Sequence, residues 1–425
     1  MNARGKAVRS LEWRVVTAAA MVLATAGGAY GQRALTWDEV RRRFEATNPT
    51  LRAARIGIDE SKAQEVTAYL RPNPDITATM DQIDPFTTNP YRPFTNAFPY
   101  LSTSYLHERQ HKRELRLASA RMGTDMAQSQ LADQERTLLY NLRNAFVQAL
   151  QAKAVLAVAR ENLAYYDRVL SVSNDRFKAG DIARVDLDRL ELQRVQFETD
   201  VETGEVNVRT AKIQLLMLLN DRTPLERFDV TGPFDFREPP ITLEELHKAA
   251  LASRPDLKAA AQAVDKAKTD YRLAVANGSW DPTFGVDVAR NPPIAAYFGV
   301  SVTIPLRLFD RNQGEKARTQ LDIHRNERLA EAVNAQVFND VDSAWATLNS
   351  NLVLLRTYKA RYLNLATRVR ETVSFAYQSG GSSLLDFLNA QNDYRSTYLN
   401  YLNLVGSYMT AASQLNLAVG REVME

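Results

Sequence analysis

The sequence predicts a mixed α and β protein, mainly helical, built from two homologous halves. Phe177–Leu187 is echoed by Tyr377–Phe387, and the glycine and the aspartate of both segments are offset by the same 200 positions. Such self-similarity at a fixed spacing indicates a duplicated architecture. Residues 100–223 and 306–425 contain no proline, which is typical of long helices. Short runs of alternating apolar and polar residues lie between these segments, and they predict β-strands.

The first residues carry four basic side chains, followed by the apolar run Val15–Ala26 and small residues near Gly31. This order predicts a secretory signal peptide over residues 1–31. Its removal would take four of the 53 basic and one of the 50 acidic residues, which leaves 49 of each. A neutral mature chain argues against a nucleic-acid partner. The chain contains no cysteine, so disulfides and cysteine-based zinc sites are excluded, and no cofactor is expected.

The first repeat is expected over residues 32–240. Alternating runs place strands at about 75–82 and 98–107, with a proline-rich connection between them. A helical hairpin should then run over about 109–221, turning near residue 180 at a glycine. One arm of some 70 residues would be on the order of 100 Å long, far longer than most globular domains require.

The second repeat is expected over residues 241–425. Its strands should lie at about 283–290 and 297–305, and its helical hairpin at about 310–420, with a turn near 380. Apolar residues at alternating steps of three and four predict a coiled-coil seam in each hairpin. In the second repeat this seam is predicted to follow Trp345, Leu348, Leu352, Leu355, Tyr362, Val369, Val373 and Ala376.

The predicted strands have one apolar and one polar face, but no segment has the 18 or so consecutive apolar residues of a membrane helix. Alternation of this kind fits either a half-buried soluble sheet or a transmembrane barrel. Four strands cannot close a barrel, and an open edge is not tolerated in lipid. If the strands enter a membrane, chains must therefore pool them, and three chains with twelve strands make the smallest plausible water-filled conduit.

With these features the chain resembles the TolC family of outer-membrane efflux proteins over essentially its whole mature length. The resemblance rests on the ordered duplication, on the paired segments Asn48–Leu51 and Arg254–Leu257, and on the two Gly-x5-Asp turns. The run Ile304–Gly314 is similar to the heavy-metal, CzcC-like branch. The resemblance implies a homotrimer: a twelve-stranded barrel in the outer membrane of a Gram-negative bacterium, continued by a helical barrel through the periplasm. It also implies a periplasmic adaptor and an inner-membrane pump, of the RND or another type, as partners.

The resemblance places the functional site at the two hairpin turns, which form the periplasmic tip of the family's channels. A bond between Tyr377 and Asp186 is implied to hold the tip closed, and Asp386 is implied to form an acidic ring at the constriction. Two residues differ from the family's pattern, since Ser382 stands for an arginine and Asn389 for a second aspartate. The surface implied to dock the adaptor consists of Gly180, Asp181, Ile182, Ala183, Arg184, Gly380, Gly381, Ser382 and Ser383.

The tip aspartates have two interpretations. A threefold ring of Asp386 in a narrow aqueous lumen would attract cations. Alternatively, Asp186 and Asp386 cap the returning helices through free backbone N–H groups. Both interpretations remain open at the level of sequence.

His107 and His111 form a literal His-Glu-x-x-His motif, the signature of zinc peptidases. That chemistry needs both histidines on one face of a continuous helix, whereas here the motif spans the end of a strand and the start of a helix. Two ordinary histidines are the better interpretation, and no enzyme activity is expected.

The preferred function is a passive exit duct of a tripartite, RND-type efflux system for metal cations or small toxic compounds. One alternative is the outer-membrane channel of a type I protein-secretion system. From a different class, the alternative is a periplasmic coiled-coil scaffold that does not enter the membrane.

Overall fold

A computed structural model of the chain describes residues 34–86, 89–238, 241–291 and 293–424. The predicted signal peptide therefore lies outside the described residues. The chain divides into two compact units, Met1–Phe44 with Gln148–Phe234, and Glu45–Val147 with Asp235–Glu425. Within the described part of the chain, no helix combines the length and the hydropathy needed to cross a bilayer.

The first unit is a helical hairpin with a short strand-like contact near its end. Tyr166 and Phe197 pack with ring centroids 4.8 Å apart, and the Tyr166 hydroxyl donates to the carbonyl of Leu190. Leu35 and Val230 form a parallel bridge. The elements of this unit are the N-terminal part of α2 (Trp37–Thr47), the C-terminal part of α4 (Lys112–Ala179), α5 (Arg184–Leu218) and η1 (Leu225–Arg227).

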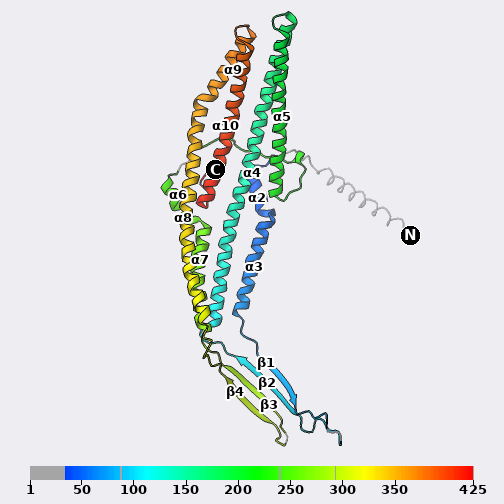
Figure 1. Ribbon diagram of the computed structural model, residues 1–425, viewed down its shortest axis with the longest axis vertical. Helices are drawn as coiled ribbons and strands as arrows, with labels where there is room; N and C mark the ends of the chain where they lie inside the picture. The colour runs from blue at the N-terminus through cyan, green and yellow to red at the C-terminus, as the bar shows by residue number, and fades with distance from the viewer. Residues whose placement is uncertain (1–33, 87–88, 239–240, 292, 425) are drawn as a thin grey trace, which may run out of the picture. The chain divides into compact units, whose positions relative to one another are not determined.

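The second unit contains a four-stranded antiparallel sheet in the order β1-β2-β3-β4 (Figure 1). Because β2 of the first repeat pairs with β3 of the second, the two repeats share one sheet, and the compact units cross the repeat boundary. The strands are β1 (Asp75–Asp81), β2 (Phe98–Leu106), β3 (Thr283–Ala289) and β4 (Tyr297–Thr303). All four begin and end within two residues of the ranges expected from alternation.

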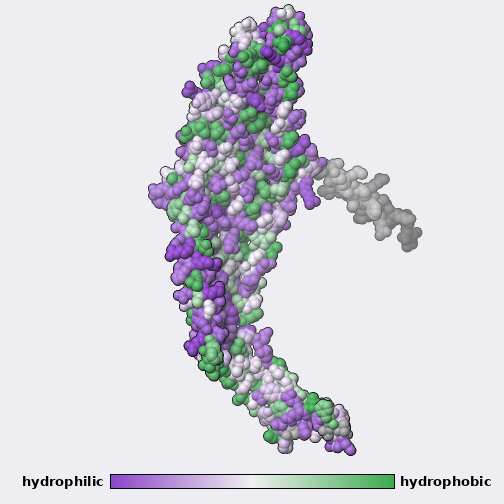
Figure 2. Space-filling view, in the orientation of Figure 1, coloured by the Kyte–Doolittle hydropathy of each residue, from purple (hydrophilic) through white to green (hydrophobic). Residues whose placement is uncertain are grey.

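The register divides the sheet into an apolar and a polar face. Directly paired residues share a face, so pairings such as Ala78 with Leu101 and Val286 with Val300 collect the apolar side chains together. The apolar face consists of Ile76, Ala78, Met80, Pro99, Leu101, Thr103, Tyr105, Phe284, Val286, Val288, Phe298, Val300 and Val302. Most of its large side chains are exposed, and the opposite face is dominated by threonine, serine, glycine and aspartate. In Figure 2 the surface over the strands is mainly pale and green.

The helices of the second unit repeat the order of the first half of the chain. α6 and α7 correspond to α2 and α3, and the paired X-Pro segments begin α3 and α7. Asn48 caps α3 by accepting from the backbone N–H of Leu51, whereas Arg254 makes no side-chain cap at α7. The helices are α3 (Pro49–Tyr69), the N-terminal part of α4, α6 (Leu243–Ser253), α7 (Pro255–Asn277), α8 (Gln313–Thr357), η2 (Tyr358–Tyr362), α9 (Leu363–Gln378) and α10 (Leu384–Val419).

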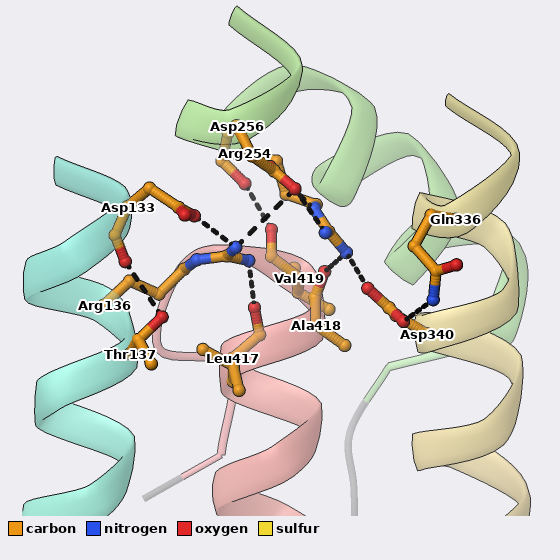
Figure 3. A network of polar contacts seen from close by, with 11 residues as sticks. Asp133, Arg136, Thr137, Arg254, Asp256, Gln336, Asp340, Leu417, Ala418 and Val419 are labelled. Atoms are coloured by element: carbon orange, nitrogen blue, oxygen red, sulfur yellow. Dashed lines mark hydrogen bonds and ion pairs between the residues drawn. The ribbon is translucent and has the colours of Figure 1, made fainter. Parts of the chain in front are cut away.

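Arg254 has a different role, in a buried polar network at the C-terminal end of α10 (Figure 3). Its side chain is only 4% exposed; it pairs with Asp256 and Asp340 and donates to the carbonyl of Ala418. Burial is the largest single effect on the pKa of Asp256 and would raise it, but the hydrogen bond from Arg254 and the charges of Arg254 and Arg136 together lower this pKa below its usual value. Gly420, with φ of +83°, ends α10, and a Cβ there would lie 3.1 Å from the Arg254 Cα.

Two further side chains complete the closure of α10. Arg136 of α4 donates to the carbonyl of Leu417, and the Ser253 hydroxyl donates to that of Val419 at 2.6 Å. The last carbonyls of a helix have no intrahelical partner. Here three of them are bound by side chains of Arg136 in α4, Ser253 in α6 and Arg254 at the junction of α6 and α7, which ties these helices to α10.

The coiled-coil seam of the second hairpin is interrupted by the π-helical turn η2. Below it, Leu348, Leu352 and Leu355 are buried as predicted. Beyond it the prediction is wrong, because Tyr362 and Val369 are 40% and 38% exposed. Arg370, Ser374 and Tyr377 are buried in place of Val369, Val373 and Ala376. A π-turn adds one residue to the helix, so the seam continues one position later.

Candidate functional site

The two hairpin turns lie at the predicted positions and have the same backbone geometry. Gly180 and Gly380 have φ of +84° and +77°, a conformation that strains residues with a Cβ. The N–H of Asp181 bonds to the carbonyl of Arg176, and that of Gly381 to the carbonyl of Ala376. Both are the six-to-one bond of a Schellman motif, so the duplication extends to the hydrogen bonding of the turns.

At the first tip, α5 begins at Arg184 without a side-chain cap. Its N-cap residue is Ala183, which has no side-chain acceptor. Arg184 pairs with Asp188 and lies 5.7 Å from the ring centre of Phe177. Asp186 lies in the first turn of α5, where the helix dipole favours a negative charge. The interpretation of Asp186 as a helix cap is therefore wrong, since α5 has no side-chain cap.

At the second tip, Ser383 and Asp386 form a complete capping box. The Ser383 hydroxyl accepts from the Asp386 N–H at 3.1 Å, and the Asp386 carboxylate accepts from the Ser383 N–H at 3.3 Å. The Ser382 hydroxyl lies 3.4 Å from the same carboxylate. The hydrogen bond from the Ser383 hydroxyl is the main cause of a lowered pKa at Asp386. This carboxylate therefore caps α10 and stays ionised.

Removing the Ser383 hydroxyl should loosen only the second tip. We expect Ser383→Ala to destabilise the first turn of α10 by about 1 kcal/mol, because caps contribute roughly that amount. Amide hydrogen exchange over residues 384–388 should then be about fivefold faster. The reciprocal change, Ala183→Ser, should slow exchange over residues 184–188. Equal responses of the two tips to Ser383→Ala would contradict this asymmetry.

Inside the second hairpin an aromatic and polar cluster lies beneath the tip. Tyr377 is 5% exposed and stacks on Phe387 with centroids 5.0 Å apart. Arg370 is also buried and lies over the Tyr394 ring at 3.5 Å. Sequence reasoning missed Arg370, because its burial depends on the register shift at η2.

The exposed face of α10 continues the polar surface below the tip. Asp386, Asn389 and Asp393 are all exposed and are spaced by three and four residues, so they share one side of the helix. Asp393 was missed by the sequence analysis, although its spacing from Asp386 could have identified it. Asn389 lies on the same side of α10 as Asp386, and the role of both residues at a constriction stays a prediction.

The predicted gate residues come from both compact units. Asp186 belongs to the first unit and Tyr377 to the second, and their pairing stays a prediction. The predicted docking residues divide between the two turns in the same way.

The His-Glu-x-x-His motif does not form a zinc-binding helix. His107 follows β2, and α4 begins only at Lys112. Gln110 and His111 have φ of 58° and 55°, which breaks any continuous helix between the two histidines. Across the described residues, no group of three or more potential ligand side chains is arranged to hold a metal ion.

The sequence is similar to a family profile and to individual proteins that are named for efflux or metal resistance. Residues 246–421 match the family profile described as Outer membrane efflux protein. The chain is 23% identical over 400 residues to the cobalt-zinc-cadmium resistance protein CzcC of Cupriavidus metallidurans, with 91% of this chain and 90% of that protein covered. It is also 23% identical over 305 residues to the outer membrane efflux protein BepC of Brucella suis, covering 68% of this chain and 65% of BepC.

Comparison with solved structures supports the fold. CusC, a protein studied for transmembrane channel formation, superimposes with a TM-score of 0.76 at 16% identity. The match covers 91% of this chain and 92% of CusC.

Proposed function

We propose that three copies of this chain form the outer-membrane channel of a tripartite efflux system, because residues 246–421 match the outer membrane efflux protein profile and the chain is similar to CzcC over 91% of its length. The channel is a passive exit duct, and an inner-membrane pump supplies the energy. A periplasmic adaptor docks on the hairpin tips and opens them. The protein lies in the outer membrane of a Gram-negative bacterium and extends into the periplasm.

The observation that carries this proposal is the division of the sheet into an apolar and a polar face. An exposed apolar face of this size is costly in water, but it suits strands that meet lipid on one side and a polar lumen on the other. Pairs of neighbouring residues such as Val300 and Ser301 point to opposite faces. A scaffold that stays in the periplasm would have no use for such a face.

The start of the long helix α4 is joined to the start of β3 by a largely buried ion pair. Lys112, at the start of α4, is buried and pairs with Asp281 at 2.6 Å, just before β3. The same carboxylate accepts from the backbone N–H of Arg109 at 2.9 Å. A buried pair of this kind holds the sheet and the long helix in one orientation.

Metal cations are the proposed substrates, on the basis of one relative and of the charge at the tip. The relative that aligns over 91% of this chain is a cobalt-zinc-cadmium resistance protein. In the proposed trimer, Asp386 forms the acidic ring with the neutral Asn389, and Asp393 adds charge one turn further along α10. Carboxylates in a narrow lumen favour cations. Neither CzcC nor BepC is named for protein secretion, so nothing favours the type I channel.

The two tips offer the adaptor different surfaces. The first presents Ile182, Ala183 and Arg184, and the second presents the serines of its capping box. In the proposed complex, adaptor hairpins therefore alternate between a larger tip that carries Asp181 and Arg184 and a small, polar one around the trimer. Tyr377 and Asp186 are proposed to hold the resting tip closed.

The proposed function is tested by expressing the full chain in a Gram-negative host and fractionating its membranes. We expect a heat-modifiable trimer in the outer membrane and cation-selective channels of small conductance in planar bilayers. Protein found only in the periplasm, with no conductance, would favour the scaffold instead.

Opening of the tip is tested by the double variant Tyr377→Phe with Asp186→Ala. Removal of the Tyr377 hydroxyl and the Asp186 carboxylate is expected to raise single-channel conductance several-fold, because the proposed hydrogen bond that holds the tip closed can no longer form. Asp188→Ala, which breaks an exposed ion pair with Arg184 in the same turn of α5, is the matched control and should leave conductance unchanged. Equal conductance of the double variant and the wild type would refute the gate assignment.

A further inference from the structure

A loop directly after β4 presents three large apolar side chains to the outside. Leu306, Leu308 and Phe309 are 80%, 64% and 90% exposed. These three residues are called the apolar knob. Figure 2 shows a green patch where the strands give way to the helices of this unit. Exposed apolar groups gathered in this way indicate an interaction surface.

The apolar knob is exposed although its loop is firmly held. The N–H of Leu308 bonds to the carbonyl of Leu306, and the Gln313 side chain donates to the carbonyl of Phe309. Asn312 donates through its side chain to the carbonyl of Ala274 in α7 at 2.8 Å. The loop is therefore preorganised, which lowers the entropy lost when it binds.

A groove lined by apolar and charged side chains lies between α3 and α4 on the same unit. It has a volume of about 690 Å³, enough for several large side chains. Val66 and Leu70 are exposed along it. Its lining consists of Lys62, Glu65, Val66, Tyr69, Leu70, Glu114, Leu117, Ala118 and Arg121. This surface is called the α3–α4 groove.

The groove is also held in place by specific contacts. Arg116 of α4 donates to the carbonyls of Ala68 and Leu70, at 3.3 and 3.4 Å. Arg113 lies 4.3 Å from the centre of the Tyr69 ring. Both contacts fasten the end of α3 to α4, so the groove keeps its shape without an occupant.

The knob and the groove lie at corresponding positions beside opposite edges of the sheet. The order β1-β2-β3-β4 makes β1 and β4 the edge strands. Because all pairs are antiparallel, the start of β1 and the end of β4 lie at the same end of the sheet. Leu70 comes five residues before Asp75, the start of β1, and Phe309 comes six residues after Thr303, the end of β4.

We propose that the apolar knob of one copy docks in the α3–α4 groove of the next copy. The inference rests on the proposed trimer, in which the free edge of β4 must pair with the free edge of β1 of a neighbour, since unpaired edges are not tolerated in lipid. That pairing brings the residues after β4 beside the residues before β1. The contact is heterologous, and in the proposed threefold-symmetric trimer three such contacts close a ring.

The polar surroundings of the two surfaces suit each other. The rim of the groove carries Lys62 and Glu114, and the loop of the knob carries Asp310 and Arg307, so each surface offers both signs of charge. Phe309 is the central aromatic side chain of the knob, and aromatic side chains contribute strongly to interfaces because each buries a large apolar area. Because the knob follows β4 directly, the docked contact lies just outside the membrane-spanning sheet and links neighbouring copies.

The chain contains no cysteine, so engineered cysteine pairs report contacts between copies without background. The test variant is Val66→Cys with Phe309→Cys, oxidised or treated with a short bis-maleimide in isolated outer membranes. We expect covalent dimers and trimers on a denaturing gel, and only monomers from either single variant. The matched control is Ile56→Cys with Phe309→Cys, because Ile56 is exposed on α3 but lies ten residues from Val66; it should not link.

A second pair separates failure of this inference from failure of the proposed trimer. Asp75→Cys with Thr303→Cys joins the two strand edges themselves. Linking of the edge pair without linking of the knob pair would overturn the docking proposal and leave the trimer intact. Absence of both links would count against the trimer as well.

Lipid is the competing occupant of the knob, and it gives a different result. A fluorophore on Phe309→Cys in vesicles of brominated phosphatidylcholine should be quenched much less than one on Val300→Cys, on the apolar face of β4. Equal quenching at the two sites would show that the knob meets lipid and would overturn the proposal.

Discussion

Replacing Arg254 by alanine is expected to lower the free energy of unfolding by about 3–5 kcal/mol, the usual cost of breaking a buried ion pair from one side. The change leaves the carboxylates of Asp256 and Asp340 without their main partner and the carbonyl of Ala418 without a donor. Unfolding of the detergent-solubilised protein in urea, followed by circular dichroism, measures the loss.

An exposed ion pair provides the comparison for this variant. Arg328 and Glu331 are both exposed on α8, and such pairs contribute little, so Arg328→Ala should change stability by less than about 0.5 kcal/mol. Arg254→Lys should recover only part of the loss, because lysine cannot form the bidentate contact with Asp256. A loss in Arg254→Ala no larger than in Arg328→Ala would refute the structural role of this network.

A charge on the apolar face of the sheet is expected to abolish assembly in the membrane. Val300 is exposed near the middle of β4 and pairs with Val286 of β3. An arginine facing lipid at the bilayer midplane costs about 2–4 kcal/mol per chain. We therefore expect Val300→Arg to remove most of the heat-modifiable trimer from outer-membrane fractions.

The neighbouring residue gives a control that differs only in the face of the sheet. Ser301 is exposed on the polar face opposite Gly285, where the absent side chain leaves room. Ser301→Arg should assemble normally and should shift ion selectivity toward anions, because it adds positive charge to the lumen. Equal loss of trimer in both variants would contradict the proposal that one face of the sheet contacts lipid and the other the aqueous lumen.

Much of the fold could be predicted because it depends on local chemistry. Alternation placed the four strands, the absence of proline delimited the long helices, and Gly180 and Gly380 located turns that need a positive φ. Each of these signals acts over a few residues. The pairing of β2 with β3 joins strands that lie far apart in the sequence. It is the arrangement expected when two hairpins lie side by side in one sheet.

The parts of the site that could not be predicted depend on contacts or register across long distances. Arg254 was noticed as the start of a repeated segment, but its partner Asp340 lies 86 residues away. Arg370 and Tyr377 are buried only because η2 shifts the seam by one residue. The capping box of Ser383 was the exception, since its Ser-x-x-Asp spacing is local and could have been recognised.

The π-turn η2 has a consequence for how this chain can vary in evolution. An added residue rotates everything beyond it by about 100° relative to an ideal helix. The orientation of Arg370, Ser374 and Tyr377 is thus encoded by the length of the chain between Tyr358 and Tyr362, and not by any one side chain there. Point substitutions in this turn leave that orientation unchanged, whereas a single-residue deletion would turn the buried side of α9 outward. Alignments of relatives should therefore tolerate changes of residue type in this turn far better than changes of length.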